Sequence, residues 1–161
     1  MDVALLDTDV FSFLNKRNHK IGALYKQHVE GKSIAITFVT KGEIYAGIEK
    51  RKLGPAARAT LERTLRHVAI IPYDDEICRI YGRLRATLRT SSGTDRGHPS
   101  NDLWIAACAI RHGLTLITHN KKDFENIPGL KIISEPPPKP DPPLAQAGNL
   151  FDPNSGKPES K

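Results

Sequence analysis

An apolar run that ends in a carboxylate lies near the start of the chain, Val3-Ala4-Leu5-Leu6-Asp7. Short runs of aliphatic and β-branched residues are typical of strands that are buried on both faces of a sheet. Four further runs have the same character, at residues 33–36, 68–71, 115–118 and 131–133. The sequence therefore predicts five strands.

Longer stretches with helical spacing of apolar residues separate these runs, at residues 10–14, 21–30, 41–50, 55–66, 75–90, 102–112 and 121–125. Pro55 after Gly54 favours a helix start, and Gly113 after His112 favours a helix end. This alternation predicts an α/β fold, a single α/β/α sandwich whose central, mostly parallel sheet is flanked by helices.

The chain has 161 residues, of which 39% are hydrophobic and 26% charged, as in an ordinary soluble domain. We expect a folded domain over residues 1–134, with a polar loop at 91–100. A Pro-rich tail at 135–161 is expected to be disordered. No apolar run approaches the roughly 20 residues of a membrane helix, and the N-terminus lacks the features of a signal peptide. A cytoplasmic protein with no membrane association is therefore expected.

The formal net charge is +6, which favours a polyanionic partner, nucleic acid above all.

Acidic residues stand where the predicted strands and helices meet. Asp7 ends the first strand, so its carboxylate should point into the crevice beyond the sheet, where α/β proteins bind ligands. Asp9, two residues later, is better explained as the cap of the next helix.

Two more acids lie at predicted helix starts. Thr40 and Glu43 have the spacing of a capping box, which would also place Glu43 near the strand ends. Asp102 opens a helix of small, apolar residues, with Ser100 or Asn101 as its cap. Such a helix should pack closely against the sheet and hold Asp102 over the crevice.

Asn120 and Asp123 follow the fourth predicted strand, and either could complete an acidic ring with Asp7, Glu43 and Asp102. Hard oxygen ligands of this kind suit Mg²⁺ or Mn²⁺. Such a cation acidifies an attacking water and neutralises charge on a phosphate. Without a cation, carboxylates this close would repel one another.

Four segments together resemble the PIN-domain ribonucleases, and within them the VapC-type toxins of type II toxin–antitoxin pairs. The segments occupy residues 5–10, 36–47, 101–107 and 115–130, including Leu5-Leu6-Asp7-Thr8-Asp9-Val10 and Asn101-Asp102-Leu103-Trp104-Ile105-Ala106-Ala107. Their order and spacing cover residues 1 to about 134.

This resemblance implies a metal-dependent endoribonuclease that hydrolyses phosphodiester bonds in RNA, often tRNA. Its catalytic, metal-binding acids fall on Asp7, Glu43 and Asp102, and the cofactor is Mg²⁺ or Mn²⁺. A fourth acid common in the family is replaced by Asn120, so Asn120, Asp123 and Asp9 are less certain ligands. The resemblance also implies a homodimer and inhibition by a cognate antitoxin protein.

Basic residues are candidates for contacts with RNA phosphates. We expect such contacts from some of Arg17, Lys50, Arg51, Arg96 and Lys121.

Two other interpretations remain open. Residues 5–10 also resemble the first motif of haloacid-dehalogenase-type phosphatases, with Asp7 as nucleophile and Asp9 as acid–base, although the further Lys and late acidic pair of that family are not evident. Asn120 also leaves open a PIN-like module that binds RNA or a partner without cutting it.

Overall fold

The computed structural model describes residues 2–88 and 99–138, and within them a five-stranded parallel sheet forms the centre of the molecule. Every paired strand is parallel, as the alternation of strands and helices predicted. The strands, in the spatial order β3-β2-β1-β4-β5, are β1 (Val3–Leu6), β2 (Ser33–Thr37), β3 (Ala69–Ile71), β4 (Thr115–Ile117) and β5 (Lys131–Ile133).

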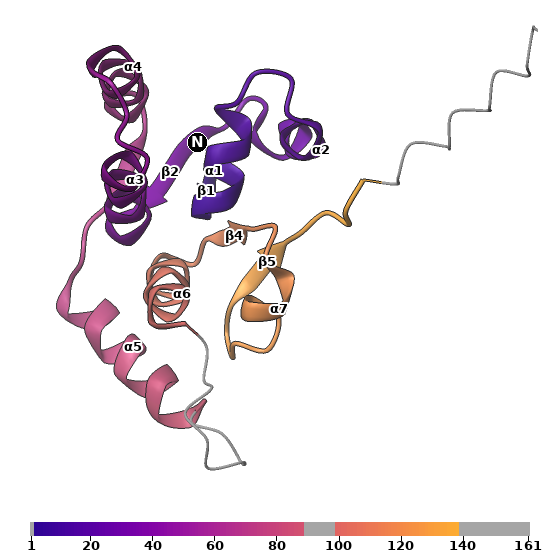
Figure 1. Ribbon diagram of the computed structural model, residues 1–161. Coiled ribbons are helices and arrows are strands. Elements are labelled where there is room, and N and C mark those ends of the chain that lie inside the picture. Colours follow the sequence, from indigo (N-terminus) through magenta and orange to yellow (C-terminus); the bar gives the residue numbers. More distant parts are fainter. Residues whose placement is uncertain (1, 89–98, 139–161) are drawn as a thin grey trace, which may run out of the picture.

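Helices cover both faces of the sheet (Figure 1), which confirms the predicted α/β/α sandwich. Successive residues of a strand point to opposite faces, so Ala4 and Leu6 pack with one set of helices and Leu5 with the other. The first set is α1 (Thr8–Leu14), α2 (Lys20–Val29), α3 (Phe38–Lys50) and α4 (Pro55–Arg66). The second is α5 (Asp75–Thr87), α6 (Ser100–His112) and α7 (Lys121–Phe124).

Helix α6 packs closely against the sheet because its buried side chains are small. Ala106, Ala107, Cys108 and Ala109 are fully buried, and Gly113, with φ of 63°, ends the helix in a left-handed turn. The predicted position of Asp102 near the strand ends is a consequence of this packing.

The strand order reverses between β1 and β4, because the chain moves outward from β1 to β2 and β3 and later returns to the other side of β1. Parallel sheets bind ligands in the crevice beyond such a reversal, at the carboxyl ends of the strands. Asp7 follows β1 and Thr118 follows β4, so polar residues meet at this point.

Two helix caps differ from those expected. Asp7, not Asp9, caps α1, since the Asp7 carboxylate accepts the amide N–H of Thr8. Helix α3 begins at Phe38 with Thr37 as its cap, and the Thr37 hydroxyl accepts the amide N–H of Thr40 at 3.1 Å. The predicted capping box of Thr40 and Glu43 is therefore wrong.

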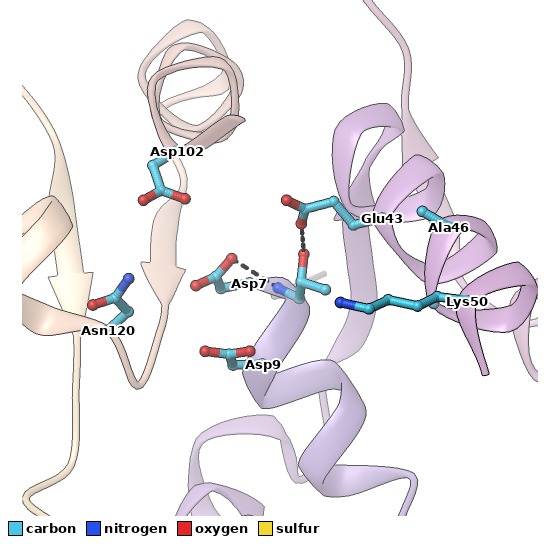
Figure 2. A pocket seen from close by; sticks show the side chains of 9 residues that line it. Asp7, Asp9, Glu43, Ala46, Lys50, Asp102 and Asn120 are labelled. Carbon is cyan, nitrogen blue, oxygen red and sulfur yellow. Dashed lines mark hydrogen bonds between the residues drawn. The ribbon is translucent and has the colours of Figure 1, made fainter. Parts of the chain in front are cut away.

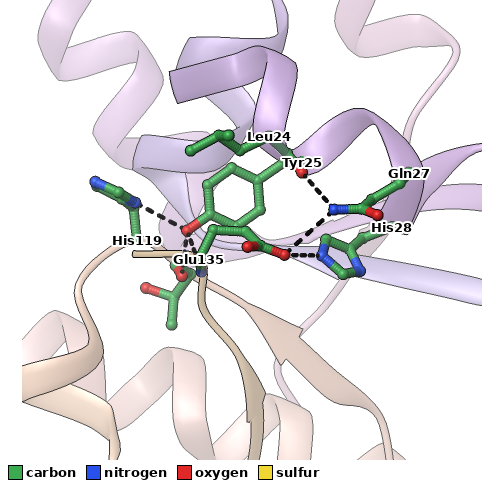
Figure 3. Close-up of polar contacts among 7 residues, drawn as sticks. Leu24, Tyr25, Gln27, His28, His119 and Glu135 are labelled. Atoms are coloured by element: carbon green, nitrogen blue, oxygen red, sulfur yellow. Dashed lines mark hydrogen bonds and ion pairs between the residues drawn. The ribbon is translucent and has the colours of Figure 1, made fainter. Parts of the chain in front are cut away.

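The chain beyond β5 is fastened to α2 by the buried hydroxyl of Tyr25 (Figure 3). This hydroxyl donates to the carbonyl of Thr118 at 3.0 Å and accepts the amide N–H of Glu135 at 3.1 Å. The Glu135 carboxylate in turn pairs with His28. Contacts with the folded domain thus include Glu135, one residue past the domain boundary expected at residue 134. Residues 139–161 of the expected tail lie outside the described residues.

We expect a chain ending at Glu135 to melt at the temperature of the full chain, and a chain ending at Ile133 to melt several degrees lower. The shorter chain loses the Glu135 hydrogen bond and ion pair, worth about 1–2 kcal/mol together, or about 3–6 °C. Thermal unfolding followed by circular dichroism measures both. Equal melting of the two truncated chains would show that Glu135 contributes nothing.

Part of the predicted 91–100 loop, residues 91–98, also lies outside the described residues. In the described part of the chain, no helix combines the length and the apolar character required to cross a bilayer.

Candidate active site

Asp7 is held in place by two hydrogen bonds, one to each carboxylate oxygen. Oδ1 accepts the amide N–H of Thr8 at 2.7 Å, and Oδ2 accepts the hydroxyl of Thr118 at 2.8 Å. Only 5% of Asp7 is exposed. Burial raises the pKa of Asp7, the two hydrogen bonds partly oppose this, and repulsion from Asp9 and Glu43 adds to it, so that the pKa reaches about 6.

Helix α3 presents Glu43, Gly47 and Lys50 on one face, because residues four and then three apart lie above one another on a helix. Both oxygens of Glu43 have partners: one accepts the hydroxyl of Thr8, and the other accepts the side-chain amide of Asn101 at 2.8 Å. Glu43 therefore links the start of α1 to the start of α6.

Asp102 lies in the first turn of α6, as expected from the sequence, although the helix begins at Ser100 and has no side-chain cap. Burial is the largest cause that raises the pKa of Asp102, to about 7. Repulsion from Asp7 is the next cause, followed by repulsion from Asp123 and Glu43. Several neighbouring carboxylates therefore repel the ionised form of Asp102.

Asn120 and Asp123 act as a pair beyond β4. The side-chain amide nitrogen of Asn120 donates to the carboxylate of Asp123, which leaves the amide oxygen as an available ligand. The backbone N–H of Asn120 donates to the hydroxyl of Thr118, the same hydroxyl that binds Asp7. Asn120 lines the pocket described next, whereas Asp123 does not line it.

These side chains surround one pocket of about 380 Å³ at the carboxyl edge of the sheet (Figure 2). Gly47 and Ala46 leave this pocket open, since a Cβ added to Gly47 would meet no atom within 4 Å. Lys50 extends toward the pocket and forms no ion pair with any residue in the described ranges. The lining residues are Asp7, Thr8, Asp9, Glu43, Ala46, Gly47, Lys50, Asp102 and Asn120.

The donors of this pocket fit a hard divalent cation by their chemistry and charge. Four carboxylates and an amide oxygen are the ligand types that Mg²⁺ and Mn²⁺ prefer, and the repulsion that raises the pKa of Asp7 and Asp102 is relieved by positive charge. In the ranges described, no three Asp, Glu, His or Cys side chains approach closely enough to share one ion as they stand. A cation there would therefore draw the carboxylates closer.

The residues expected to contact RNA are scattered. Lys50 lines the carboxylate pocket and Arg51 lines the hollow beside it. Arg17 is exposed between α1 and α2, and Lys121 pairs with Glu125 at 3.7 Å, away from the pocket lining. Arg96 lies outside the described residues.

Thr8, Asn101 and Thr118 orient the acids, and sequence reasoning did not predict this for any of them; it considered Asn101 only as a helix cap. Thr118 could have been found, because it is a polar residue that directly follows a buried strand, as Asp7 does. The partners of Glu43 could not, since they lie 35 and 58 residues away in the chain.

Comparisons with known proteins identify the family of this chain. The PIN domain model matches residues 4–130. Ribonuclease VapC1 of Haemophilus influenzae (strain R2866) is 30% identical over 132 residues, which cover 80% of this chain and 95% of that protein. The tRNA(fMet)-specific endonuclease VapC of Salmonella typhimurium is 29% identical, covering 80% and 94%.

A solved structure has a similar fold. The structure of VapBC2 from Rickettsia felis, bound to a DNA fragment from the promoter of the pair, matches with a TM-score of 0.68 and 28% identity. The match covers 83% of this chain and 99% of that chain. Since the family model spans residues 4–130, most of the chain, the chain belongs to the PIN domain family and is a relative of the VapC ribonucleases.

Proposed function

We propose that this protein is an endoribonuclease that depends on Mg²⁺ or Mn²⁺ and serves as the toxin of a toxin–antitoxin pair. The observation that carries the proposal is the gathering of Asp7, Asp9, Glu43 and Asp102 around one pocket at the strand reversal. Burial and the repulsion of nearby carboxylates raise the pKa of Asp7 and of Asp102, and such shifts in a shared pocket are characteristic of sites that bind cations or move protons.

The proposed substrate is RNA, with structured RNA such as tRNA as the first candidate. Two relatives, from Salmonella typhimurium and Shigella flexneri, are named tRNA(fMet)-specific endonucleases. The net charge of +6 suits a polyanion. The proposed location of this activity is the cytoplasm.

Asp7, Glu43 and Asp102 are the proposed ligands of the cation, with Asn120 and Asp9 as further candidates and Asp123 as the residue that orients Asn120. When bound, the cation supplies positive charge that acidifies the attacking water and neutralises the phosphate oxygens. The chain's own contribution is to hold the ligands. Thr8 and Thr118 fix Asp7, and Thr8 and Asn101 fix Glu43.

Lys50 is the proposed phosphate contact inside this pocket. Its ammonium group extends toward the pocket from the same helix face as Glu43. A cation on one wall of an acidic pocket attracts a phosphodiester that the carboxylates alone would repel.

The proposed protein partners are a cognate antitoxin and a second copy of the chain. Solved structures with similar folds include VapBC complexes from Rickettsia felis and nontypeable Haemophilus influenzae. One exposed aromatic residue is compatible with a homodimer: Tyr73 is 71% exposed and packs on Phe38, which in turn packs on Trp104. Light scattering on the purified chain measures the dimer mass.

The proposal is tested by incubating the purified chain with total cellular RNA in Mg²⁺ and sequencing the new 5′ ends. We expect cleavage at a few defined positions, which EDTA abolishes. RNA affinity without EDTA-sensitive cleavage would instead support a binding module. The phosphatase alternative has lost its support through the PIN family match, and turnover of a generic phosphomonoester with a trapped phospho-aspartate would restore it.

A further inference from the structure

A second hollow of about 360 Å³ adjoins the carboxylate pocket, between α1 and α3. Phe13, Lys16 and Arg51 line it and do not line the carboxylate pocket, and we refer to it as the α1–α3 hollow. The two cavities are neighbours, because Thr8, Asp9, Glu43 and Gly47 line both of them.

Two cations stand on opposite walls of the α1–α3 hollow. Lys16 follows α1, and its Nζ atom lies 5.7 Å from the centre of the Phe13 ring. Arg51 is the C-cap of α3, on the other wall. Neither side chain forms an ion pair with any residue that the structure describes, and both are exposed. Their charges are therefore available to a ligand.

The α1 side of the hollow belongs to a segment without acids. Residues 10–29 include four Lys or Arg residues and no Asp or Glu. Phe13 holds Lys16 beside the hollow, because its ring stacks on His19 with ring centres 4.5 Å apart and the Lys16 Nζ atom lies over it. A wall that carries cations and no acids attracts the phosphate backbone of a nucleic acid strand.

We propose that the α1–α3 hollow binds the nucleotide next to the scissile phosphate of an RNA strand, with Lys16 and Arg51 contacting that nucleotide's phosphate. This inference rests on the proposed function, since it takes the scissile phosphate to lie in the carboxylate pocket. The nucleotide next to that phosphate would then lie near the α1–α3 hollow, because Thr8 and Gly47 line both cavities. The two cations offset the repulsion from Asp9 and Glu43 on the shared wall.

The test measures RNA binding in a chain that cannot cut. Full-length Asp102→Asn protein is titrated against a fluorescent, random-sequence pool of short single-stranded oligoribonucleotides, and anisotropy is recorded at several salt concentrations. Adding Lys16→Ala or Arg51→Ala should lower the affinity about 3- to 10-fold and reduce the salt slope by about 0.7 each. Both positions are exposed, so neither substitution should alter the melting temperature by more than a few degrees.

Two control variants make the result specific. Lys16→Arg keeps the charge and should keep the affinity. Lys131→Ala removes an exposed lysine at the amino end of β5, on the opposite edge of the sheet, and should have no effect.

Unchanged RNA affinity in Lys16→Ala and Arg51→Ala overturns the inference, and so does equal weakening by Lys131→Ala. If both variants instead lose affinity only for an acidic peptide, the hollow is a protein-binding surface and the inference is also overturned. Cleavage by the wild-type chain is measured separately. If the wild-type chain cuts RNA but the Lys16→Ala and Arg51→Ala substitutions leave RNA affinity unchanged, the proposed function stands. In that case only the proposal that the α1–α3 hollow binds RNA is rejected.

Discussion

Asp102→Asn is expected to lower RNA cleavage by at least about 1,000-fold, a loss of about 4 kcal/mol of transition-state stabilisation. Burial, and after it the repulsion of Asp7, Asp123 and Glu43, raises the pKa of Asp102, so a bound cation would stabilise its ionised form. The amide keeps the size of the side chain and removes its charge. Asp7→Asn is expected to have an effect of the same order, since Asp7 follows β1 and lines the same pocket as Asp102.

The loss should occur without loss of the fold. Because Asp102→Asn removes a repelled carboxylate, the metal-free variant should melt at or above the temperature of the wild type at pH 8. Asp75→Asn is the matched control: it alters an exposed acid in the first turn of α5 and should cleave like the wild type. Full activity in Asp102→Asn would remove this residue from the site.

The agreement between expected and observed fold has a physical cause at β1. Leu5 and Leu6 must be buried on opposite faces, so their run could only be a central strand, and a polar residue directly after it had to lie at the edge of the sheet. Parallel strands bring all such ends to one edge. For this reason Asp7 and Asn120 could be placed together from the sequence.

The caps were harder to predict because they depend on where the backbone turns from extended to helical. Thr37 and Thr40 are both buried threonines, and both could cap a helix. The pairing of Thr37 with Ile71 extends β2 by one residue and puts the turn immediately after it. Strand register, which is a property of two distant segments, therefore selected the cap.

Contacts between distant side chains were beyond prediction from one sequence. The sequence pattern places Tyr25 among the ordinary apolar residues of α2. Its hydroxyl nevertheless forms hydrogen bonds with the backbone of Thr118 and of Glu135, which are 93 and 110 residues later in the chain. The choice of partner depends on how α2 packs over the end of β4, which local patterns do not specify.

The metal-free protein is expected to lose stability as the pH rises from 5 to 8, and divalent cations are expected to restore it. The folded-state pKa values of Asp7 and Asp102, about 6 and 7, lie above the ordinary 3.8. Folding therefore favours their protonated forms. This contribution to the free energy of unfolding is fully present below about pH 4 and is lost as the pH rises through 6 and 7.

For the pair, with the partly exposed Asp102 discounted for solvent screening, the expected loss is about 2 kcal/mol. A cation that binds only the ionised, folded site adds about 2.7 kcal/mol at a concentration 100 times its Kd. Melting temperatures in EDTA and in excess Mg²⁺ or Mn²⁺, at pH 5 and pH 8, measure both effects. Stabilisation by the cation should be several degrees at pH 8 and small at pH 5, and Asp102→Asn should abolish most of it. Equal stabilisation of wild type and Asp102→Asn by the cation would mean that it binds elsewhere and that the gathered carboxylates are not its ligands.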